Sequence, residues 1–235
     1  MQELHDLCRG PNDEKELRGL ARVDTYDEDS FSQGHSEFKM AHNAAFGSLA
    51  AHCNGLASTA AVFYLDGPRG RTTQSLLALG FDRRLLFTAN WHKDTCAALK
   101  ASPHRVTNVI HARAEDALGS ADMFAQCRFD AVYLDGCGGA TKPIAESMKA
   151  LFADHRRDIN PERMAIGFTL TEAEPTGRSL ANREMDLHRS LAALCRSRGY
   201  RMEHVSDAPT LYGVDEGILK KDGGTLTSWH VCVRL

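Results

Sequence analysis

Residues 61–80 read AVFYLDGPRGRTTQSLLALG, and they contain a complete unit of alternating structure. The first part, 61–65, is a short and continuous apolar run, which is typical of a strand buried on both faces of a parallel sheet. The DGPRG sequence at 66–70 interrupts that run with residue types that favour turns. The remaining residues have a helical pattern that closes at Gly80, a residue type that commonly ends helices. The stretch therefore predicts a strand, a turn and a helix in succession.

The same alternation continues towards the C-terminus. Further apolar runs typical of buried strands occupy 85–90, 106–111, 129–135 and 164–170. Helical patterns lie between or after them at 92–102, 114–127, 143–152 and 180–199. Strands that are apolar on both faces and alternate with helices indicate a parallel sheet that is covered on both sides.

The last two apolar runs, 200–205 and 228–235, break this alternation. No helical pattern long enough for a crossover separates them, so they predict an antiparallel pair. We therefore expect an α/β fold with three layers, in which a mostly parallel sheet ends in an antiparallel strand pair.

The N-terminal part of the chain differs from the rest in composition. Residues 1–37 are polar and mixed in charge, which is typical of a flexible arm or a loosely docked lid. The Ala-rich stretch 38–56 has apolar residues at helical spacing and predicts a helix. A length of 235 residues suits one large α/β domain. We expect an arm at 1–37 and a single domain at 38–235 that includes the N-terminal helix.

Composition and charge exclude several classes of protein. The formal net charge of −3 offers no global electrostatic case for binding nucleic acid or an anionic membrane. No apolar stretch approaches the roughly 18–20 residues that span a bilayer. The seven cysteines include no C-x-x-C pair and the histidines show no metal-ligand spacing, so no metal site is expected. We expect a soluble protein with free thiols, in the cytoplasm or another reducing intracellular compartment.

Polar and glycine residues gather where the predicted parallel strands end. The carboxyl ends of parallel strands share one edge of the sheet, and open α/β sheets bind their ligands beyond that edge. The residues in question are Asp66, Gly67 and Gly70 after the first strand, Asn90 and Trp91 after the second, Glu115 and Asp116 after the third, Asp135 after the fourth, and Glu172 and Glu174 after the fifth. Several carboxylates on one rim suit a cationic ligand, whereas a pyrophosphate requires backbone N–H donors without nearby negative charge.

In the order and spacing of these residues, the chain from about residue 60 to 235 resembles the class I S-adenosylmethionine-dependent methyltransferases, which have a Rossmann-like fold. The likeness includes an acidic turn with glycines after the first strand and an FD-x-V-x-x-D fourth strand at 129–135. The chain departs from the family pattern at two places. Pro68 and Thr72 stand where the family has glycines, and Asn90 stands where an Asp or Glu usually binds the ribose hydroxyls.

The resemblance implies a role for each residue of the rim. It places Asp66, Gly67 and Gly70 along the amino-acid part of S-adenosylmethionine, Asn90 at the ribose, Asp116 at the adenine, and Asp135 at both the cofactor and the methyl acceptor. Glu115 beside Asp116 is also expected to bind the cofactor. The Trp91 indole is expected to stack on the adenine ring. Asp135 and Glu172 are the residues expected to act on the acceptor.

The same residues also have structural interpretations. Asp66 and Gly70 suit an ordinary turn between a strand and a helix, and Asn90 suits a local cap. Asp116 suits a helix N-terminus, where the helix dipole favours an acid. The sequence leaves both kinds of interpretation open.

Cys137 invites a comparison with RNA cytosine-5 methyltransferases, which carry a Pro-Cys pair after the acid of the fourth strand. Here the proline is missing and residues 167–175 contain no second cysteine, so a small residue in a glycine-rich loop is the favoured interpretation. Between Arg156 and Arg201 several arginines fit a phosphate-binding track or a solvated helical face about equally well. They include Arg156, Arg157, Arg178, Arg183, Arg189, Arg196 and Arg198.

The sequence as a whole predicts an S-adenosylmethionine-dependent methyltransferase with an unidentified acceptor. RNA is slightly favoured over a small molecule. Two alternatives stay open, a catalytically inactive S-adenosylmethionine-binding protein and another nucleotide-binding Rossmann protein such as an oxidoreductase. The missing G-x-G-x-x-G argues against the oxidoreductase. Nothing in the sequence indicates the oligomeric state.

Overall fold

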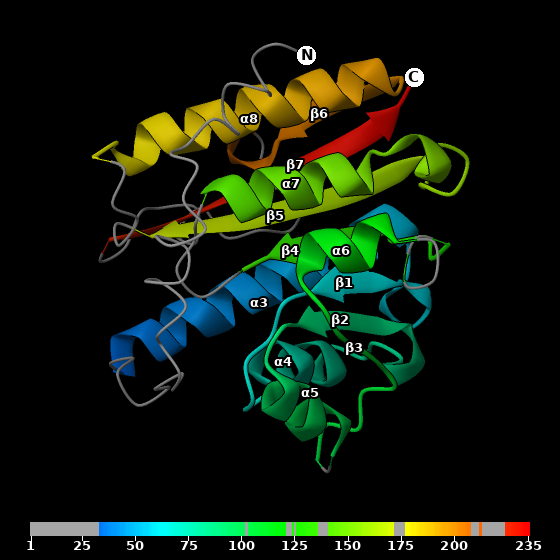
Figure 1. Cartoon of the computed structure of the whole chain (residues 1–235), viewed down its shortest axis with the longest axis vertical. Coiled ribbons are helices and arrows are strands. Elements are labelled where there is room, and N and C mark those ends of the chain that lie inside the picture. Colours follow the sequence, from blue (N-terminus) through cyan, green and yellow to red (C-terminus); the bar gives the residue numbers. More distant parts are fainter. Residues whose placement is uncertain are drawn as a thin grey trace.

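The computed structural model describes residues 33–101, 103–120, 124, 126–135, 141–171, 177–207, 212 and 224–235 (Figure 1). Within these residues, seven strands form one sheet in the order β3-β2-β1-β4-β5-β7-β6. Their bounds are β1 Val62–Tyr64, β2 Leu86–Asn90, β3 Asn108–His111, β4 Ala131–Leu134, β5 Arg163–Thr171, β6 Tyr200–His204 and β7 Thr225–Arg234. The strands β1 to β5 pair in parallel, and β7 is antiparallel to both β5 and β6. The expected mostly parallel sheet with an antiparallel pair at its end is confirmed.

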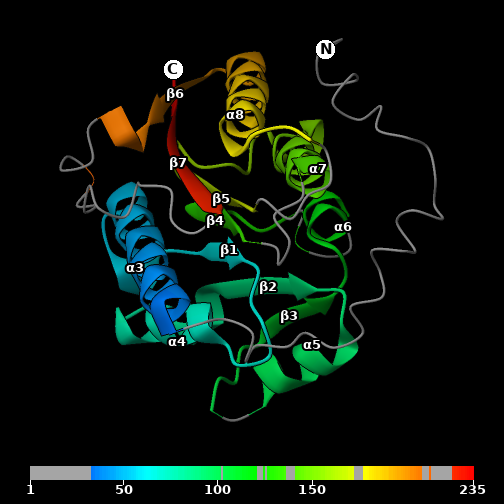
Figure 2. The same ribbon diagram turned by 90° about the vertical axis from the view of Figure 1, so that its left-hand side faces the viewer.

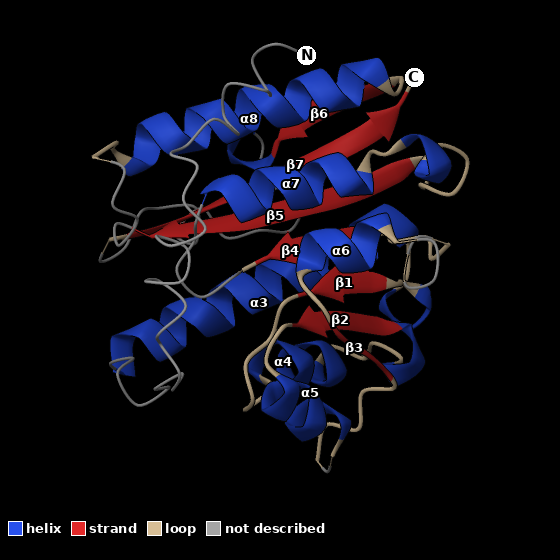
Figure 3. Cartoon of the chain, in the orientation of Figure 1, coloured by secondary structure: helices blue, strands red, loops and turns tan. Residues whose placement is uncertain are grey.

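Helices cover both faces of this sheet (Figures 2 and 3). Their bounds are α3 Gln33–Asn54, α4 Arg71–Ala78, α5 Lys93–Lys100, α6 Ala114–Gly119, α7 Thr141–Leu151 and α8 Leu180–Ser197. The apolar sides of α3, α4 and α5 form one buried cluster with the sheet, and those of α6, α7 and α8 form a second cluster on the opposite face. In β1, Phe63 belongs to the second cluster and its neighbours Val62 and Tyr64 to the first, so both faces of the strand are buried as expected.

The helix α3 begins earlier than the expected start at residue 38, since Gln33 is already helical. Residues 1–32 of the expected arm lie outside the described residues. The buried side chains of α3 include Phe46 and Leu49, both fully inaccessible. The Phe46 ring lies 5.4 Å from the Tyr133 ring and 6.1 Å from the Trp229 ring, measured between centroids. The helix is therefore an integral layer of the domain and packs on the centre of the sheet.

The helix α6 is shorter than the stretch 114–127 predicted from the sequence. It ends at Gly119, and the chain then turns back so that the Phe124 N–H donates to the Ala117 carbonyl at 3.1 Å. This return buries the Phe124 ring among the rings of Phe63, Phe87 and Phe129. The burial of one aromatic ring thus outweighs the local helical pattern.

A close contact between β5 and β7 stabilises the centre of the sheet. Gly167 faces Trp229 across the antiparallel pair, and a Cβ placed on Gly167 would lie 2.0 Å from the indole Cζ3 atom. Only a glycine leaves room for the indole to lie flat on the strand at this point. Trp229 is accordingly 1% exposed.

None of the helices that the structure describes has both the length and the apolar character needed to cross a bilayer.

Candidate functional site

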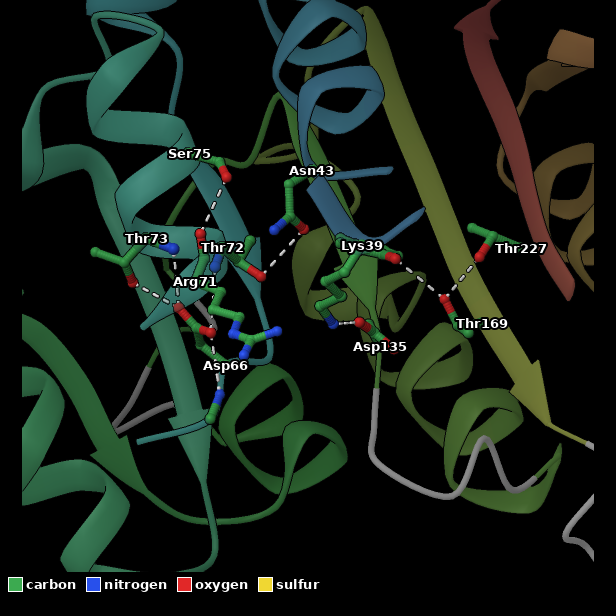
Figure 4. A network of polar contacts seen from close by, with 12 residues as sticks. Lys39, Asn43, Asp66, Arg71, Thr72, Thr73, Ser75, Asp135, Thr169 and Thr227 are labelled. Carbon is green, nitrogen blue, oxygen red and sulfur yellow. Dashed lines mark hydrogen bonds and ion pairs between the residues drawn. The ribbon is translucent and has the colours of Figure 1, made fainter. Parts of the chain in front are cut away.

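The strand order places the candidate site at the centre of the sheet. β1 pairs with β2 on one side and with β4 on the other, so the chain reverses its direction of winding between β1 and β4. Ligands of open α/β sheets bind at such a switch point, beyond the carboxyl ends of the strands. Asp66 and Asp135 follow β1 and β4 and lie at the same edge (Figure 4). Asn90 ends β2, and its side chain contacts the Asp66 carbonyl.

The Asp66 carboxylate is bound by the turn to which it belongs. One oxygen accepts hydrogen bonds from the N–H groups of Gly67 at 3.0 Å and Thr72 at 3.3 Å. The other accepts from the Thr73 N–H at 2.8 Å and the Thr73 hydroxyl at 2.7 Å. Thr72 and Thr73 lie in the first turn of α4, so Asp66 caps the start of this helix. Its observed role is to hold the shape of the turn.

Burial and hydrogen bonding shift the pKa of the Asp66 carboxyl in opposite directions. Burial raises the pKa of the Asp66 carboxyl, while the hydrogen bonds from Thr73 and the positive charge of Lys39 lower it. The net direction is upward. The side chain is 8% exposed, so a charged Asp66 depends on these donors.

Gly70 is required by its backbone and by a neighbouring ring. Its φ of 59° lies in the left-handed region, and a Cβ at this position would lie 2.7 Å from the His104 ring. Gly67 takes part through its backbone, because its carbonyl accepts the Gly70 N–H at 2.9 Å. The structure thus explains the two glycines by the path of the turn, and their expected packing under a cofactor stays a prediction.

Asn90 connects two of the turns on this edge. Its amide nitrogen donates to the Asp66 carbonyl at 3.1 Å, and its amide oxygen accepts the His92 N–H at 2.8 Å. Trp91 next to it is 50% exposed, and its carbonyl accepts a hydrogen bond from His111 Nε2 at 2.7 Å. Asn90 therefore has the local capping role, while the Trp91 indole is open to a ligand.

Glu115 and Asp116 stand in the first turn of α6. Asp116 is exposed, and Glu115 is half-buried with the Arg113 guanidinium 4.0 Å away. Burial raises the pKa of the Glu115 carboxyl. Acids at this place fit the helix dipole, so their contact with adenine stays a prediction.

Lys39 is a site residue that the sequence analysis missed. Its ammonium group forms an ion pair with the Asp135 carboxylate at the end of β4, and it lies 5.9 Å from the centre of the Tyr133 ring (Figure 4). The side chain of Asp135 is 11% exposed and that of Lys39 32%. Nothing in the local sequence signals this contact, because α3 precedes the alternating part of the chain and approaches the edge only through the tertiary fold.

The same helix also contacts the Asp66 turn. Asn43 is one helical turn after Lys39, and its amide oxygen accepts a hydrogen bond from the Thr72 hydroxyl at 3.2 Å. His42 between them is buried, and burial followed by the charge of Lys39 lowers its pKa from 6.5 to about 4. One face of α3 thus reaches both acidic turns of the candidate site.

A chain of buried hydroxyl groups lies beside the Lys39–Asp135 pair. The Tyr133 hydroxyl is 3.1 Å from the Thr169 hydroxyl. The Thr169 hydroxyl is in turn 3.0 Å from the Thr227 hydroxyl (Figure 4). These groups connect β4, β5 and β7 at the level of the site. Glu172, Glu174 and Cys137 lie outside the described residues, so their expected roles stay predictions.

Two of the arginines assigned to a surface track are buried, which corrects that interpretation for them. Arg156 donates to the carbonyls of Phe124 at 2.9 Å and Cys127 at 2.6 Å, and Arg183 donates to the Thr171 carbonyl at 2.7 Å. Both side chains are almost inaccessible. They satisfy backbone carbonyls between α6 and β4 and at the end of β5 instead of facing solvent or phosphate.

These features define the class of fold. The described residues form a Rossmann-like fold of the kind found in methyltransferases, and the likeness inferred from the sequence is confirmed at the level of the fold. One similar structure is that of the plantazolicin methyltransferase BpumL in complex with a monoazolic desmethylPZN analogue and SAH. It has a TM-score of 0.58 and 10% sequence identity, with 100% of this chain and 98% of that chain covered.

A second similar structure is that of the plantazolicin methyltransferase BamL in complex with a triazolic desmethylPZN analogue and SAH. Its TM-score is 0.55 and its identity 12%, with 95% of this chain and 92% of that chain covered. No family model matches the sequence, and no curated protein matches it significantly. The solved structures therefore establish the architecture of the chain.

Proposed function

We propose that the chain is an S-adenosylmethionine-dependent methyltransferase whose cofactor binds at the switch point between β1 and β4. One observation carries the proposal: the Asp66 carboxylate occupies the first free N–H groups of α4, those of Thr72 and Thr73. In dinucleotide-binding proteins these amides hold a pyrophosphate. A carboxylate in that place repels phosphate and suits a cofactor that carries a positive charge and no phosphate.

The other residues of the edge are compatible with an adenosyl cofactor. The half-exposed Trp91 indole offers a face on which adenine can stack. The Asn90 amide uses one N–H and one lone pair in its described contacts, which leaves one of each for a ribose hydroxyl. Gly70 and its left-handed turn keep bulky side chains away from the start of α4. The fold likeness to methyltransferases solved with SAH adds independent support.

Lys39 and Asp135 are the residues that we assign to the acceptor. When bound, the cofactor supplies a methyl group already activated by its sulfonium, so the chain chiefly has to align the acceptor. The Asp135 carboxylate can accept a hydrogen bond from an acceptor O–H or N–H. Lys39 orients that carboxylate through the ion pair. Glu172 is the second acid predicted to act here.

The acceptor has two candidates. The sequence analysis slightly favours RNA. The burial of Arg156 and Arg183 favours the alternative, a small or peptide-like acceptor, because it removes two of the cations that a phosphate track would use. The ligands named for BpumL and BamL, desmethylPZN analogues, agree with that alternative.

Calorimetric titration of the full chain with S-adenosylmethionine, S-adenosylhomocysteine and NAD tests the cofactor. We expect both sulfur compounds to bind with one site per chain and NAD to give no heat. Binding of NAD without a response to either sulfur compound would refute the proposal.

Methyl transfer is tested with labelled S-adenosylmethionine against RNA, DNA and the small-molecule and peptide fractions of a cell extract. Asp135→Asn should lower transfer at least about 100-fold with little change in cofactor affinity, because general base and orienting groups contribute about that factor. Asp154→Asn, which alters an ion pair with Arg198 at an exposed acid, is the matched control and should transfer normally. Equal activity of the two variants would remove Asp135 from the mechanism.

A further inference from the structure

Three histidines that the proposed methyl transfer does not use meet where β6 and β7 form the last two strands of the sheet. His188 comes from the middle of α8, His204 from the end of β6 and His230 from β7. One ring nitrogen of each lies within 4.8 Å of one ring nitrogen of each of the others. The ring centroids are 4.8 to 5.6 Å apart.

The secondary structure holds these rings together. His204 and His230 are direct partners in the antiparallel pair β6–β7, which brings neighbouring side chains close on one face of the sheet. On α8, Glu184 precedes His188 by four residues and so lies on the same side of the helix. Its carboxylate is 3.9 Å from His204 Nε2. Three imidazoles therefore converge from three elements, and the Glu184 carboxylate lies beside one of them.

The surroundings of His230 suit metal binding. His230 is fully buried, and its Nδ1 atom has no hydrogen-bond partner among the described residues. A buried nitrogen of this kind is costly unless a hydrogen-bond partner or an ion satisfies it.

An ion can reach the cluster from solvent. His188 and His204 line an open cavity of about 670 Å³ on the outside of the sheet, between α8 and β6. Asp207 lies at its margin, 4.0 Å from His204 Nδ1. Two carboxylates close to the rings make this location attractive to a cation.

We propose that His188, His204 and His230, with Glu184 as the fourth ligand, bind a divalent transition-metal ion, with zinc the favoured ion. Three imidazoles and one carboxylate are a ligand set that zinc accepts in tetrahedral geometry. With bonds of about 2.0–2.1 Å, the ligand atoms of such a site are about 3.3 Å apart, so the rings have to approach each other by about 1 Å or more. Rotation of the half-buried His188 and His204 side chains supplies this movement.

The alternative is a cluster held by hydrogen bonds alone. The Ser228 hydroxyl lies 3.1 Å from His204 Nε2 and 3.2 Å from His230 Nε2, and it can bridge the two rings. In that arrangement the cluster needs no ion, and metal should bind only weakly. The two arrangements differ in stoichiometry and in their response to the loss of His188, which the Ser228 bridge does not involve.

The metal site is separate from the proposed cofactor site. Along β7, Cys232 packs in the cluster that α8 covers, and Trp229 packs in the cluster that α3 covers. His230 is two residues from Cys232 and shares its face, whereas Lys39 approaches from the α3 side. Bound metal would therefore connect α8 to the β6–β7 pair and stabilise these last two strands of the sheet.

The experiment uses the full chain, stripped of metal with a chelator and carrying no histidine tag. Titration with Zn²⁺ against a chromophoric competitor should give one tight site per chain, and Mg²⁺ should give none. His188→Gln and His204→Gln should each weaken zinc binding by about 100-fold or more, since even the loss of an outer-shell partner costs about 10–100-fold. His155→Gln, which changes an exposed histidine elsewhere, is the matched control and should bind zinc like the wild type.

A second measurement covers the case in which a variant does not fold. Co²⁺ added to the wild-type chain should give the strong visible absorption of a tetrahedral site, and Zn²⁺ should remove it. Absence of that absorption, less than one zinc per chain, or equal zinc affinity of His188→Gln and His155→Gln would each overturn the proposal. Calorimetry with S-adenosylmethionine on the same samples keeps this result distinct from the test of the cofactor site.

Discussion

The two acidic turns at the centre of the sheet use their carboxylates in different ways. Asp66, after β1, accepts four hydrogen bonds, all from residues of its own turn and the first turn of α4. Asp135, after β4, is held by Lys39, which belongs to a helix far away in the sequence. The first carboxylate is held by local structure, and the second is paired with a cation from a distant helix.

This difference separates the parts of the site that shape it from those that act. A carboxylate whose oxygens are all occupied by backbone and hydroxyl donors has little capacity left for a ligand. A carboxylate held by a lysine can exchange part of that contact for a substrate group. The helix α3 links the two turns, because Asn43 contacts Thr72 and Lys39 contacts Asp135.

Asp66→Ala should have the largest effect. The change leaves the Thr72 and Thr73 N–H groups without their acceptor, and loss of a charged cap with several hydrogen bonds should cost about 3 kcal/mol. Chemical denaturation measures this cost, and calorimetry should show that cofactor binding is lost with the turn. Asp66→Asn keeps one acceptor oxygen, so its stability should lie between those of the wild type and Asp66→Ala. An unchanged free energy of unfolding in Asp66→Ala would mean that the turn does not depend on its cap.

The pH dependence of stability should report on His42, which lies on α3 between the two turns. Its pKa is lowered from 6.5 to about 4, so between these values an unfolded chain binds a proton that the folded chain does not. The contribution of neutral His42 to the free energy of unfolding is therefore fully present above pH 6.5. It is lost as the pH drops towards 4, which lowers the stability by about 3 kcal/mol. Denaturation of His42→Phe should show a flatter dependence than the wild type, and the surface variant His155→Phe should not. Identical profiles for all three would contradict this assignment.

The glycine of the Asp66 turn can be tested against a matched position. Gly70 and Gly80 both have a positive φ, but a Cβ on Gly70 meets His104 at 2.7 Å while a Cβ on Gly80 meets nothing within 4 Å. Gly80→Ala should cost about 1 kcal/mol for the backbone alone, and Gly70→Ala about 2 kcal/mol because His104 must also move. Thermal or chemical denaturation measures both. If the two variants lose the same stability, the His104 contact does not constrain the turn.

Lys39→Met should have the smallest effect on folding. A partly exposed ion pair contributes less than about 1 kcal/mol, and methionine retains most of the apolar stem. Methyl transfer should nevertheless fall at least about 10-fold, because Asp135 loses the cation that orients it. Comparison with Asp135→Asn and with the double variant tests whether the two residues act as one unit. Strictly additive losses in rate would show that they act separately.

The sequence analysis predicted the fold well where local patterns coincide with tertiary requirements. In residues 61–80 the apolar run, the turn and the helix are each favoured locally, and the structure keeps all three. The predicted helix at 114–127 failed after Gly119, because the Phe124 ring is buried by a return of the chain that no local pattern encodes. Arg156 and Arg183 were placed on a surface by their charge, while their contacts are carbonyls in the interior.

The candidate site was predictable only in part, for the same reason. Asp66, Asn90 and Asp135 follow from the rule that polar residues collect at the ends of parallel strands. Lys39 does not follow from it, because its partner is chosen by the packing of α3. The three histidines escaped notice because the register of β6 with β7 and the position of α8 bring them together, and no fixed spacing in the sequence reflects that geometry.

The indole that lies flat on Gly167 gives the protein two optical probes in different surroundings. The chain has two tryptophans, and Trp229 is 1% exposed while Trp91 is 50% exposed. Fluorescence from the buried indole should be blue-shifted and shielded from iodide, whereas that of Trp91 should be red-shifted and readily quenched. Changes at the rim of the sheet and in its interior can thus be followed separately in one unlabelled sample.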